Sequence, residues 1–160
     1  DKGQVAATDL ILVDDGAAVV GGHGRASAET LLHLAIVQQS GAGAVLHSHS
    51  QAGTLLSQWA LAKGELCHQG LEMLKGLEGI TSHACHVAVP VLANDQDLQR
   101  LSQAARPRLA AAPHGLLIAG HGLYAWGRDL GAAQRHLQIH EFLLEQRWRQ
   151  LLLQGLGLQP

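Results

Sequence analysis

Two histidines separated by a single residue, His47 and His49, are the side chains of this sequence best placed to do chemistry. They follow the apolar residues 43–46, a run that is typical of a buried strand. Alternate side chains of a strand point to the same face, so the two imidazoles are expected to project together. Such a pair is half of a tetrahedral metal site, and a catalytic ion needs one more protein ligand and an open position. Two structural histidines would produce the same local pattern.

A third histidine, His121, stands between two glycines directly after the apolar residues 115–119. Glycine on both sides permits a close backbone approach or an unusual φ angle, so this side chain can turn toward its neighbours. Three neutral imidazoles with one open position would suit a catalytic zinc ion that polarises a carbonyl or binds water. The alternative is a buried imidazole that is hydrogen-bonded to a backbone carbonyl.

Other residues that can bind metals have weaker support. His136 and His140 share one face of a predicted helix, but His140 belongs to its apolar stripe, which favours packing or a subunit contact over a zinc site. Cys67 and Cys85 have no close cysteine partner, which argues against a thiolate zinc site.

Two carboxylates have both a structural and a chemical interpretation. Glu72 stands three residues before Lys75, and such a pair on a helical turn is usually an exposed ion pair. Glu29 falls in the first turn of a predicted helix, where the helix dipole favours a negative charge, and Ser27 before it is a good N-cap residue. The residue types alone therefore assign no chemistry to either carboxylate.

The elements that would position these residues alternate between helices and strands. Two pairs of strands are close enough in sequence to form hairpins, which predicts one α/β domain with a mixed or antiparallel sheet. Pro90 is expected at an edge or an end of its strand because proline cannot donate to a strand ladder. The predicted strands are residues 10–13, 17–20, 43–49, 81–92, 115–119 and 123–127, the predicted helices are residues 28–39, 51–62, 97–106 and 129–154, and residues 63–79 are left unassigned.

The composition limits the class of protein. The chain has 160 residues, of which 47% are hydrophobic and only 15% charged, so part of its surface is expected to lie against other subunits. A formal net charge of −2 offers no footprint for nucleic acid or a membrane surface. No apolar run reaches the roughly 18 residues of a membrane span, and no signal peptide opens the sequence. Two cysteines are too few for a disulfide framework, which predicts reduced thiols and a cytoplasmic location.

Two longer motifs carry a family resemblance. Gly-Ala-Val-Leu-His-Ser-His-Ser at residues 43–50 and Gly-His-Gly-Leu-Tyr-Ala-Trp-Gly at residues 120–127 resemble the class II aldolase/adducin family. Residues 1–3, 27–30 and 94–97 and the last helix support the resemblance, which covers nearly the whole chain. It implies a three-layer α/β/α fold with a mixed, largely antiparallel central sheet, in a single domain spanning residues 1–160. Family members usually carry a further N-terminal Ser-Gly-Asn segment that helps to bind the substrate phosphate, and this sequence is expected to lack it.

The resemblance also implies a chemistry. It is strongest to the dehydratase branch of the family, whose members act on a ketose phosphate in methionine salvage. It implies one zinc ion per subunit on His47, His49 and His121, in a homotetramer with active sites near the subunit interfaces. In the dehydratase branch, a glutamate at the position of Glu72 is the catalytic acid/base. In the aldolase branch, a glutamate at the position of Glu29 has that role.

The resemblance leaves alternatives open. Since both glutamates are present, a related metal-dependent sugar-phosphate aldolase or epimerase is the second interpretation. A metal-free, adducin-like interaction module is the third, although all three candidate zinc ligands are present. Ser27, Glu29 and Lys75 are the candidate substrate contacts, and an exposed, solvated lysine is the simpler interpretation of Lys75.

Overall fold

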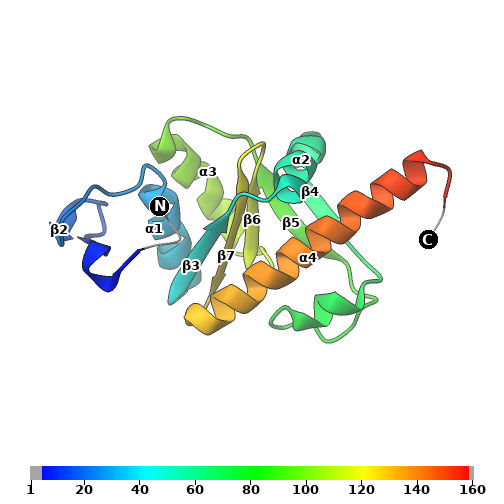
Figure 1. The fold of residues 1–160 in the computed structure, drawn as a ribbon, viewed down its shortest axis with the longest axis horizontal. Coiled ribbons are helices and arrows are strands. Elements are labelled where there is room, and N and C mark those ends of the chain that lie inside the picture. The colour runs from blue at the N-terminus through cyan, green and yellow to red at the C-terminus, as the bar shows by residue number, and fades with distance from the viewer. Residues whose placement is uncertain (1–4, 159–160) are drawn as a thin grey trace.

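The computed structural model describes residues 5–158 (Figure 1). A central sheet of five strands has the order β3-β7-β6-β5-β4, and a separate two-stranded ribbon pairs β1 with β2. In chain order the elements are η2 (Ala7–Asp9), β1 (Leu12–Val13), β2 (Val19–Gly21), α1 (Thr30–Ser40), β3 (Ala44–Ser48), α2 (Gln51–Ala60), η3 (Leu61–Lys63), β4 (Glu65–His68), η4 (Glu72–Gly76), β5 (Val87–Leu92), α3 (Leu98–Leu109), β6 (Gly115–Ile118), β7 (Gly122–Gly127) and α4 (Leu130–Gly155).

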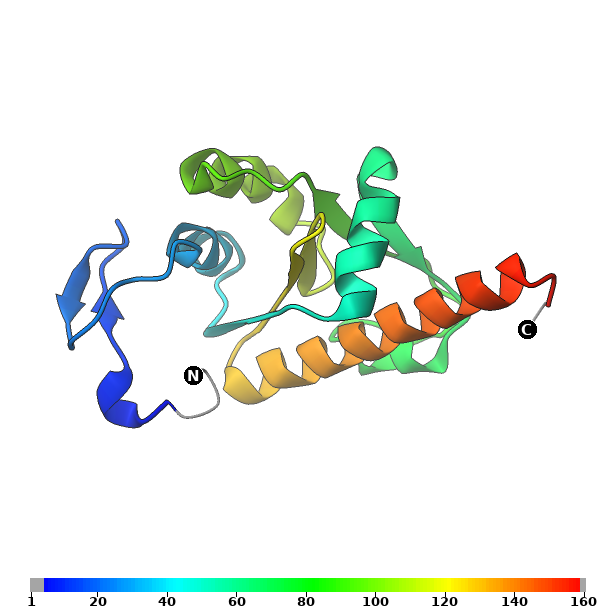
Figure 2. The ribbon, with the colours of Figure 1, turned by 45° about the horizontal axis from the view of Figure 1, so that its top comes forward.

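The central sheet is mixed and largely antiparallel, which confirms the prediction. Strands β5 and β6 run parallel, with Val91 opposite Leu117, because α3 carries the chain back between them. The other three pairs of neighbouring strands are antiparallel. Helices cover both faces of the sheet, with α1 and α3 on one side and α2 and α4 on the other (Figure 2).

Alternating side chains of β6 divide the core into two layers. Leu116 and Ile118 pack toward α1 and α3, whereas Leu117 between them packs toward α2 and α4. All three are fully buried, and each such burial contributes roughly 1.5–3 kcal/mol to folding. A sheet that is buried on both faces leaves only its edges and strand ends for a site. No helix of residues 5–158 has the length and apolar character needed to cross a lipid bilayer.

The middle of the chain differs most from the sequence-based expectation. Strand β4 lies in the segment to which the sequence patterns assign no element, and β5 begins at Val87 rather than at residue 81. Placing Pro90 at an edge or strand end was wrong, because β5 lies between β6 and β4. Pro90 is tolerated there because it faces Glu65, the first residue of β4, and the pairing with β6 begins only at Val91. The N–H that proline lacks is therefore not required for the hydrogen bonds of β5 with either β4 or β6.

The histidine pair of the last helix is part of the core. His136 Nδ1 donates to the carbonyl oxygen of Trp126 at 2.7 Å, and its Nε2 accepts from the Glu78 N–H at 3.2 Å. His140 Nε2 donates to the Pro113 carbonyl at 2.9 Å, and burial lowers the pKa of His140 to about 3. Both side chains are buried and hydrogen-bonded to backbone groups, so the packing interpretation describes them.

Candidate metal centre and active site

Three histidines and one glutamate converge at one end of β3. One side-chain nitrogen or oxygen atom from each of Glu29, His47, His49 and His121 lies within 4.8 Å of the others. His47 Nε2 is 2.7 Å from His49 Nε2 and 3.4 Å from His121 Nε2. The Glu29 carboxylate completes the group, with Oε1 2.9 Å from His121 Nε2 and Oε2 3.5 Å from His47 Nε2. The structure thus brings together the three histidines that the sequence singled out.

Antiparallel pairing of β3 with β7 is the reason that these residues meet. Ser48 lies opposite Leu123 in this pair, so the turn before β7 falls beside the end of β3. That turn contains Gly120, whose φ of +67° is accessible to glycine at little cost, and His121, whose N–H donates to the Ile118 carbonyl at 3.0 Å. The glycine that precedes His121 therefore allows the tight reversal that aims the imidazole at β3.

The ring of His47 is held by its surroundings. Its Nδ1 donates to the Leu123 carbonyl at 2.9 Å, which leaves Nε2 with a free lone pair directed at the cluster. The Tyr124 ring stacks on the face of the imidazole, with 4.0 Å between the ring centroids and 18° between the ring planes. Desolvation, partly opposed by the bond to Leu123, lowers the pKa of His47 to about 4. A neutral imidazole with a fixed tautomer is the form that binds a metal ion.

The Glu29 carboxylate can reach the cluster because it makes no capping hydrogen bond to its own helix. Helix α1 begins at Thr30, and Glu29 is its N-cap residue with a helical backbone and no capping side-chain bond. The prediction of Ser27 as N-cap was therefore wrong by two positions. Ser27 Oγ instead accepts the N–H of Glu29 at 3.3 Å, which supports the turn into the helix. The carboxylate is left free to point at the histidines.

The donor set fits a divalent metal ion. Three imidazole nitrogens with an open fourth position would match a catalytic zinc ion, with the Glu29 carboxylate beside it, and imidazoles also accept iron, cobalt or manganese. Three ring nitrogens and a carboxylate oxygen that lie within 4.8 Å of one another present to one point the lone pairs that a divalent ion needs. This convergence supports metal binding.

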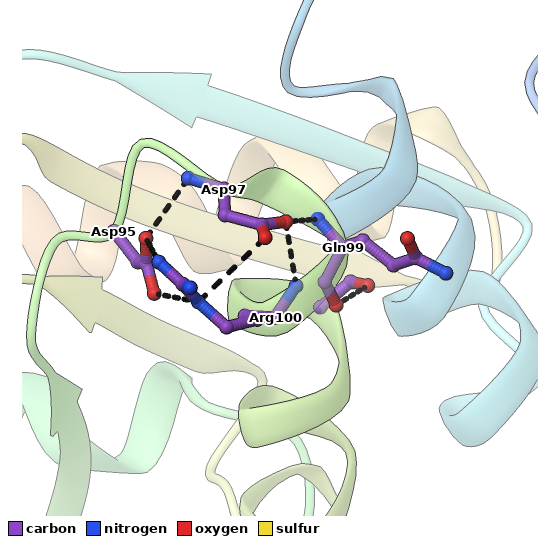
Figure 3. Close-up of polar contacts among 5 residues, drawn as sticks. Asp95, Asp97, Gln99 and Arg100 are labelled. Atoms are coloured by element: carbon purple, nitrogen blue, oxygen red, sulfur yellow. Dashed lines mark hydrogen bonds and ion pairs between the residues drawn. The ribbon is translucent and has the colours of Figure 1, made fainter.

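A cavity of about 270 Å³ opens beside the cluster, and its wall includes Glu29, His121 and residues 94–96. Figure 3 shows how this wall is fixed: Arg100 donates to both oxygens of Asp95 at 2.9 Å, and Asp97 accepts the N–H groups of Gln99 and Arg100 at 3.1 Å. The predicted capping segment thus caps α3 through Asp97. The cavity therefore adjoins two members of the cluster, Glu29 and His121.

The glycine after His121 permits the close approach of β3 and β7. A Cβ atom on Gly122 would lie 2.1 Å from the Ser48 carbonyl oxygen and about 3 Å from the rings of His47 and His49. We expect Gly122→Ala to lower the free energy of unfolding by about 3 kcal/mol and to reduce the metal content, because the two strands must separate. Urea denaturation and metal analysis measure both effects. Gly131→Ala is the control, since its Cβ would meet nothing closer than 3.4 Å and alanine favours a helix. Equal stability of the two variants would contradict the prediction.

The other predicted site residues lie elsewhere in the chain. Glu72 and Lys75 are paired with each other in η4, and the Glu72 side chain is 72% exposed. Glu72 Oε2 also lies 3.7 Å from His83 Nδ1. The hydrogen bond from Lys75 holds the pKa of Glu72 below its usual range, the opposite of the raised pKa that a general acid needs. Within residues 5–158 of one chain, Glu29 is the carboxylate in the histidine cluster, and Glu72 is not part of it.

Two residues near the metal centre were missed by the sequence analysis. Tyr124, which is fully buried, stacks on His47, and the His33 ring meets the Tyr124 ring edge-on at 5.3 Å. The position of Tyr124 opposite His47 depends on the register between β3 and β7, which no local pattern reveals. For His33 a local signal exists, since it follows Glu29 by four residues and so lies on the same helix face.

The sequence places the chain in one family. Residues 1–148 match the family described as Class II Aldolase and Adducin N-terminal domain. The protein therefore belongs to the class II aldolase and adducin family.

Named relatives are similar over most of the chain. A methylthioribulose-1-phosphate dehydratase of Sorangium cellulosum is 40% identical over 148 residues, which cover 90% of this chain and 70% of the relative. An enzyme of the same name from Xanthomonas campestris pv. campestris (strain 8004) is 44% identical over 146 residues, with coverages of 90% and 67%. The chain thus spans about two thirds of the length of such relatives.

Solved structures of two aldolases share the fold. An L-fuculose 1-phosphate aldolase superposes with a TM-score of 0.72 at 19% identity, covering 96% of this chain and 66% of that one. The L-fuculose-1-phosphate aldolase of Thermus thermophilus gives a TM-score of 0.67 at 24% identity, with coverages of 98% and 74%. At these identities the likeness establishes the architecture alone.

Proposed function

We propose that this protein is a metal-dependent hydro-lyase that converts 5-methylthioribulose 1-phosphate to 2,3-diketo-5-methylthiopentyl 1-phosphate, a step of methionine salvage. The observation that carries the proposal is the convergence of Glu29, His47, His49 and His121 beside a cavity. The dehydratases that are 40–44% identical to this chain support the choice of substrate. The cytoplasmic location stays a prediction.

We assign the metal site to His47, His49 and His121, with zinc as the proposed ion. Such an ion supplies Lewis-acid polarisation of the ketose carbonyl and the adjacent hydroxyl. His47 is held for this task by Leu123 and Tyr124, so its nitrogen keeps one direction during turnover. The buried Tyr124 ring also keeps water away from that side of the imidazole.

The reaction removes one molecule of water, and the two carboxylates divide the proton transfers. Glu29, which lies at the histidines, receives the proton from C3 of the substrate. Glu72 donates a proton to the C4 hydroxyl, which leaves as water with the electron pair of the C4–O bond. The C3–H electron pair forms the C3–C4 double bond, and the resulting enol tautomerises to the diketone.

This assignment requires a second copy of the chain. Glu72 lies in η4, outside the cluster of its own chain, so a neighbouring subunit must bring its own Glu72 to the metal centre. Exposed apolar side chains on α2 and α4 are available for such contacts, among them Leu55, Trp59 and Phe142 at 44–48% exposure. We therefore propose a homo-oligomer, with four subunits as the expected number, whose active sites lie at subunit interfaces. Burial at the interface would also raise the pKa of Glu72.

Aldol cleavage is the second candidate, because Glu29 rather than Glu72 lies at the histidines. In that reaction the C4 hydroxyl loses its proton and becomes an aldehyde as the C3–C4 bond breaks, and C3 keeps the electron pair of that bond and takes up a proton. Ser27 supports the Glu29 backbone, and Lys75 is paired with Glu72, so their direct contacts with substrate stay predictions. The intact cluster of metal-binding residues disfavours a metal-free interaction module.

The products of one substrate distinguish these functions. We expect the metal-loaded protein to convert methylthioribulose 1-phosphate to the diketone, observed by nuclear magnetic resonance. Dihydroxyacetone phosphate and methylthioacetaldehyde would instead establish aldol cleavage. A folded, metal-loaded protein that forms neither product would contradict both enzymatic proposals.

A further inference from the structure

A buried hydroxyl of α2 is hydrogen-bonded to the turn that carries His121. Ser57 is fully buried, on the face of α2 that packs in the core layer shared with α4. Its Oγ donates to the Thr54 carbonyl at 2.9 Å and accepts the N–H of Gly120 at 3.1 Å. Alanine at this position would favour the helix and bury no polar group. What serine adds here is its bond to the turn.

The turn between β6 and β7 is held through its backbone N–H groups. Residues 119–121 lie outside both strands. The Ala119 N–H donates to the Leu92 carbonyl of β5 at 2.8 Å, whereas the Gly120 N–H finds its acceptor in the Ser57 side chain. The turn is therefore anchored to both β5 and α2.

The His121 imidazole lacks the hydrogen bond that usually fixes a metal-binding histidine. Its Nε2 faces the cluster, 2.9 Å from Glu29 Oε1, and its Nδ1 is buried without a hydrogen-bond partner among residues 5–158. Most metal-binding histidines donate from their second ring nitrogen to a neighbouring acceptor, as His47 does to the Leu123 carbonyl. Since His121 makes no such bond, the position of its backbone has a larger part in aiming the ring.

Helix α2 is also continuous with the segment that carries the other two histidines. His49 is followed by Ser50, the N-cap residue of α2. Thr54, one turn further, donates from Oγ1 to the Ser50 carbonyl at 2.7 Å, and Ser57 follows after nearly another turn. The helix therefore connects the backbone of His49 to that of His121. A shift between α2 and the turn would change the distances between the imidazoles.

We propose that Ser57 is a positioning residue of the metal centre, whose hydroxyl fixes the Gly120 N–H and thereby aims His121 at the cluster. The proposal rests on the metal site assigned above to His47, His49 and His121. Without the hydroxyl, the turn loses its bond to α2, and the third imidazole is held less firmly where the ion needs it. Groups that support metal ligands in this way typically change metal affinity by about 10–100-fold.

Zinc affinity, measured on the full chain by competition with a chelator, tests the proposal. We expect Ser57→Ala to bind zinc at least tenfold more weakly than the unmodified chain, and Ser102→Ala to bind it within twofold. Ser102 is the matched control, a helix serine that is 8% exposed and donates to the Gln99 carbonyl at 2.9 Å. Within residues 5–158, no hydrogen bond joins its side chain to a metal-binding segment.

The possible failures of this experiment are distinguishable. Equal zinc affinities of Ser57→Ala and Ser102→Ala would overturn the role of Ser57 and leave the metal site standing. An unmodified chain that binds no zinc would overturn the metal site and this proposal with it.

The melting temperature separates positioning from support of the fold. A hydroxyl that only stabilises the fold would affect the metal-free and the zinc-loaded protein alike, so the rise in melting temperature caused by zinc would stay the same. A positioning hydroxyl changes the rise itself, because at a fixed zinc concentration the rise depends on zinc affinity. We therefore expect a smaller rise in Ser57→Ala than in Ser102→Ala. A full rise in a destabilised Ser57→Ala protein would overturn the proposal.

Discussion

Replacing His49 with alanine is expected to remove the metal ion from the protein and to lower dehydratase turnover by about 10³-fold. His49 Nε2 lies 2.7 Å from His47 Nε2 within the cluster, whereas the His49 residue as a whole is exposed. The variant should therefore fold normally while losing one of three imidazole ligands. A loss of about 4 kcal/mol of transition-state stabilisation, a typical contribution of a Lewis-acid metal, corresponds to this factor. His49 is a better choice than His47, whose ring also packs on Tyr124.

Mass spectrometry of the purified protein measures the metal and identifies it. We expect about one zinc per chain in the unmodified protein and in His23→Ala, and almost none in His49→Ala. His23 is a suitable control because it is an exposed histidine in the segment between β2 and α1. Stoichiometric metal in His49→Ala, or equal losses in both variants, would contradict the assigned site. A different metal at full occupancy would preserve the site and correct the identity of the ion.

The chemistry of the histidines could be anticipated because it is encoded locally. Alternation in a strand places His47 and His49 on one face, and the glycines around His121 indicate a tight reversal. Their meeting depends on the antiparallel pairing of β3 with β7, which joins residues more than seventy positions apart. The family resemblance supplied that long-range information. Local patterns alone left open whether His121 was a ligand or a core residue.

The parts of the fold that were missed depend on non-local contacts. Strand β4 has four residues and exists because it pairs with β5, so no strong pattern identifies it in isolation. The proline rule placed β5 at an edge because it uses the sequence alone. It does not include the pairing of β5 with β4 and β6, in which the nitrogen of Pro90 makes no hydrogen bond. The same limit explains the error at α1, where both Ser27 and Glu29 are acceptable first-turn residues. Only tertiary contacts with the histidines show where the Glu29 carboxylate points.

Glu72 gives the second large expected effect. We expect Glu72→Gln to lower turnover by about 10²–10⁴-fold, the usual contribution of a general acid, while the metal content stays at one ion per chain. The ion pair with Lys75 is exposed, so its loss should change stability little. The retained metal distinguishes Glu72→Gln from His49→Ala, which is expected to lose both its metal and its activity.

Mixing these two inactive variants tests where Glu72 acts. If each active site combines the histidines of one chain with Glu72 of another, random hybrids of His49→Ala and Glu72→Gln subunits contain about a quarter of intact sites. We therefore expect activity to reappear after the two variants are unfolded and refolded together, or produced in one cell. Hybrids of Glu72→Gln with Glu72→Gln carrying a second tag control for the procedure. Verified hybrids that stay inactive would show that Glu72 does not act across an interface. The proton transfers would then belong to Glu29, the carboxylate that each chain already holds at its own histidines.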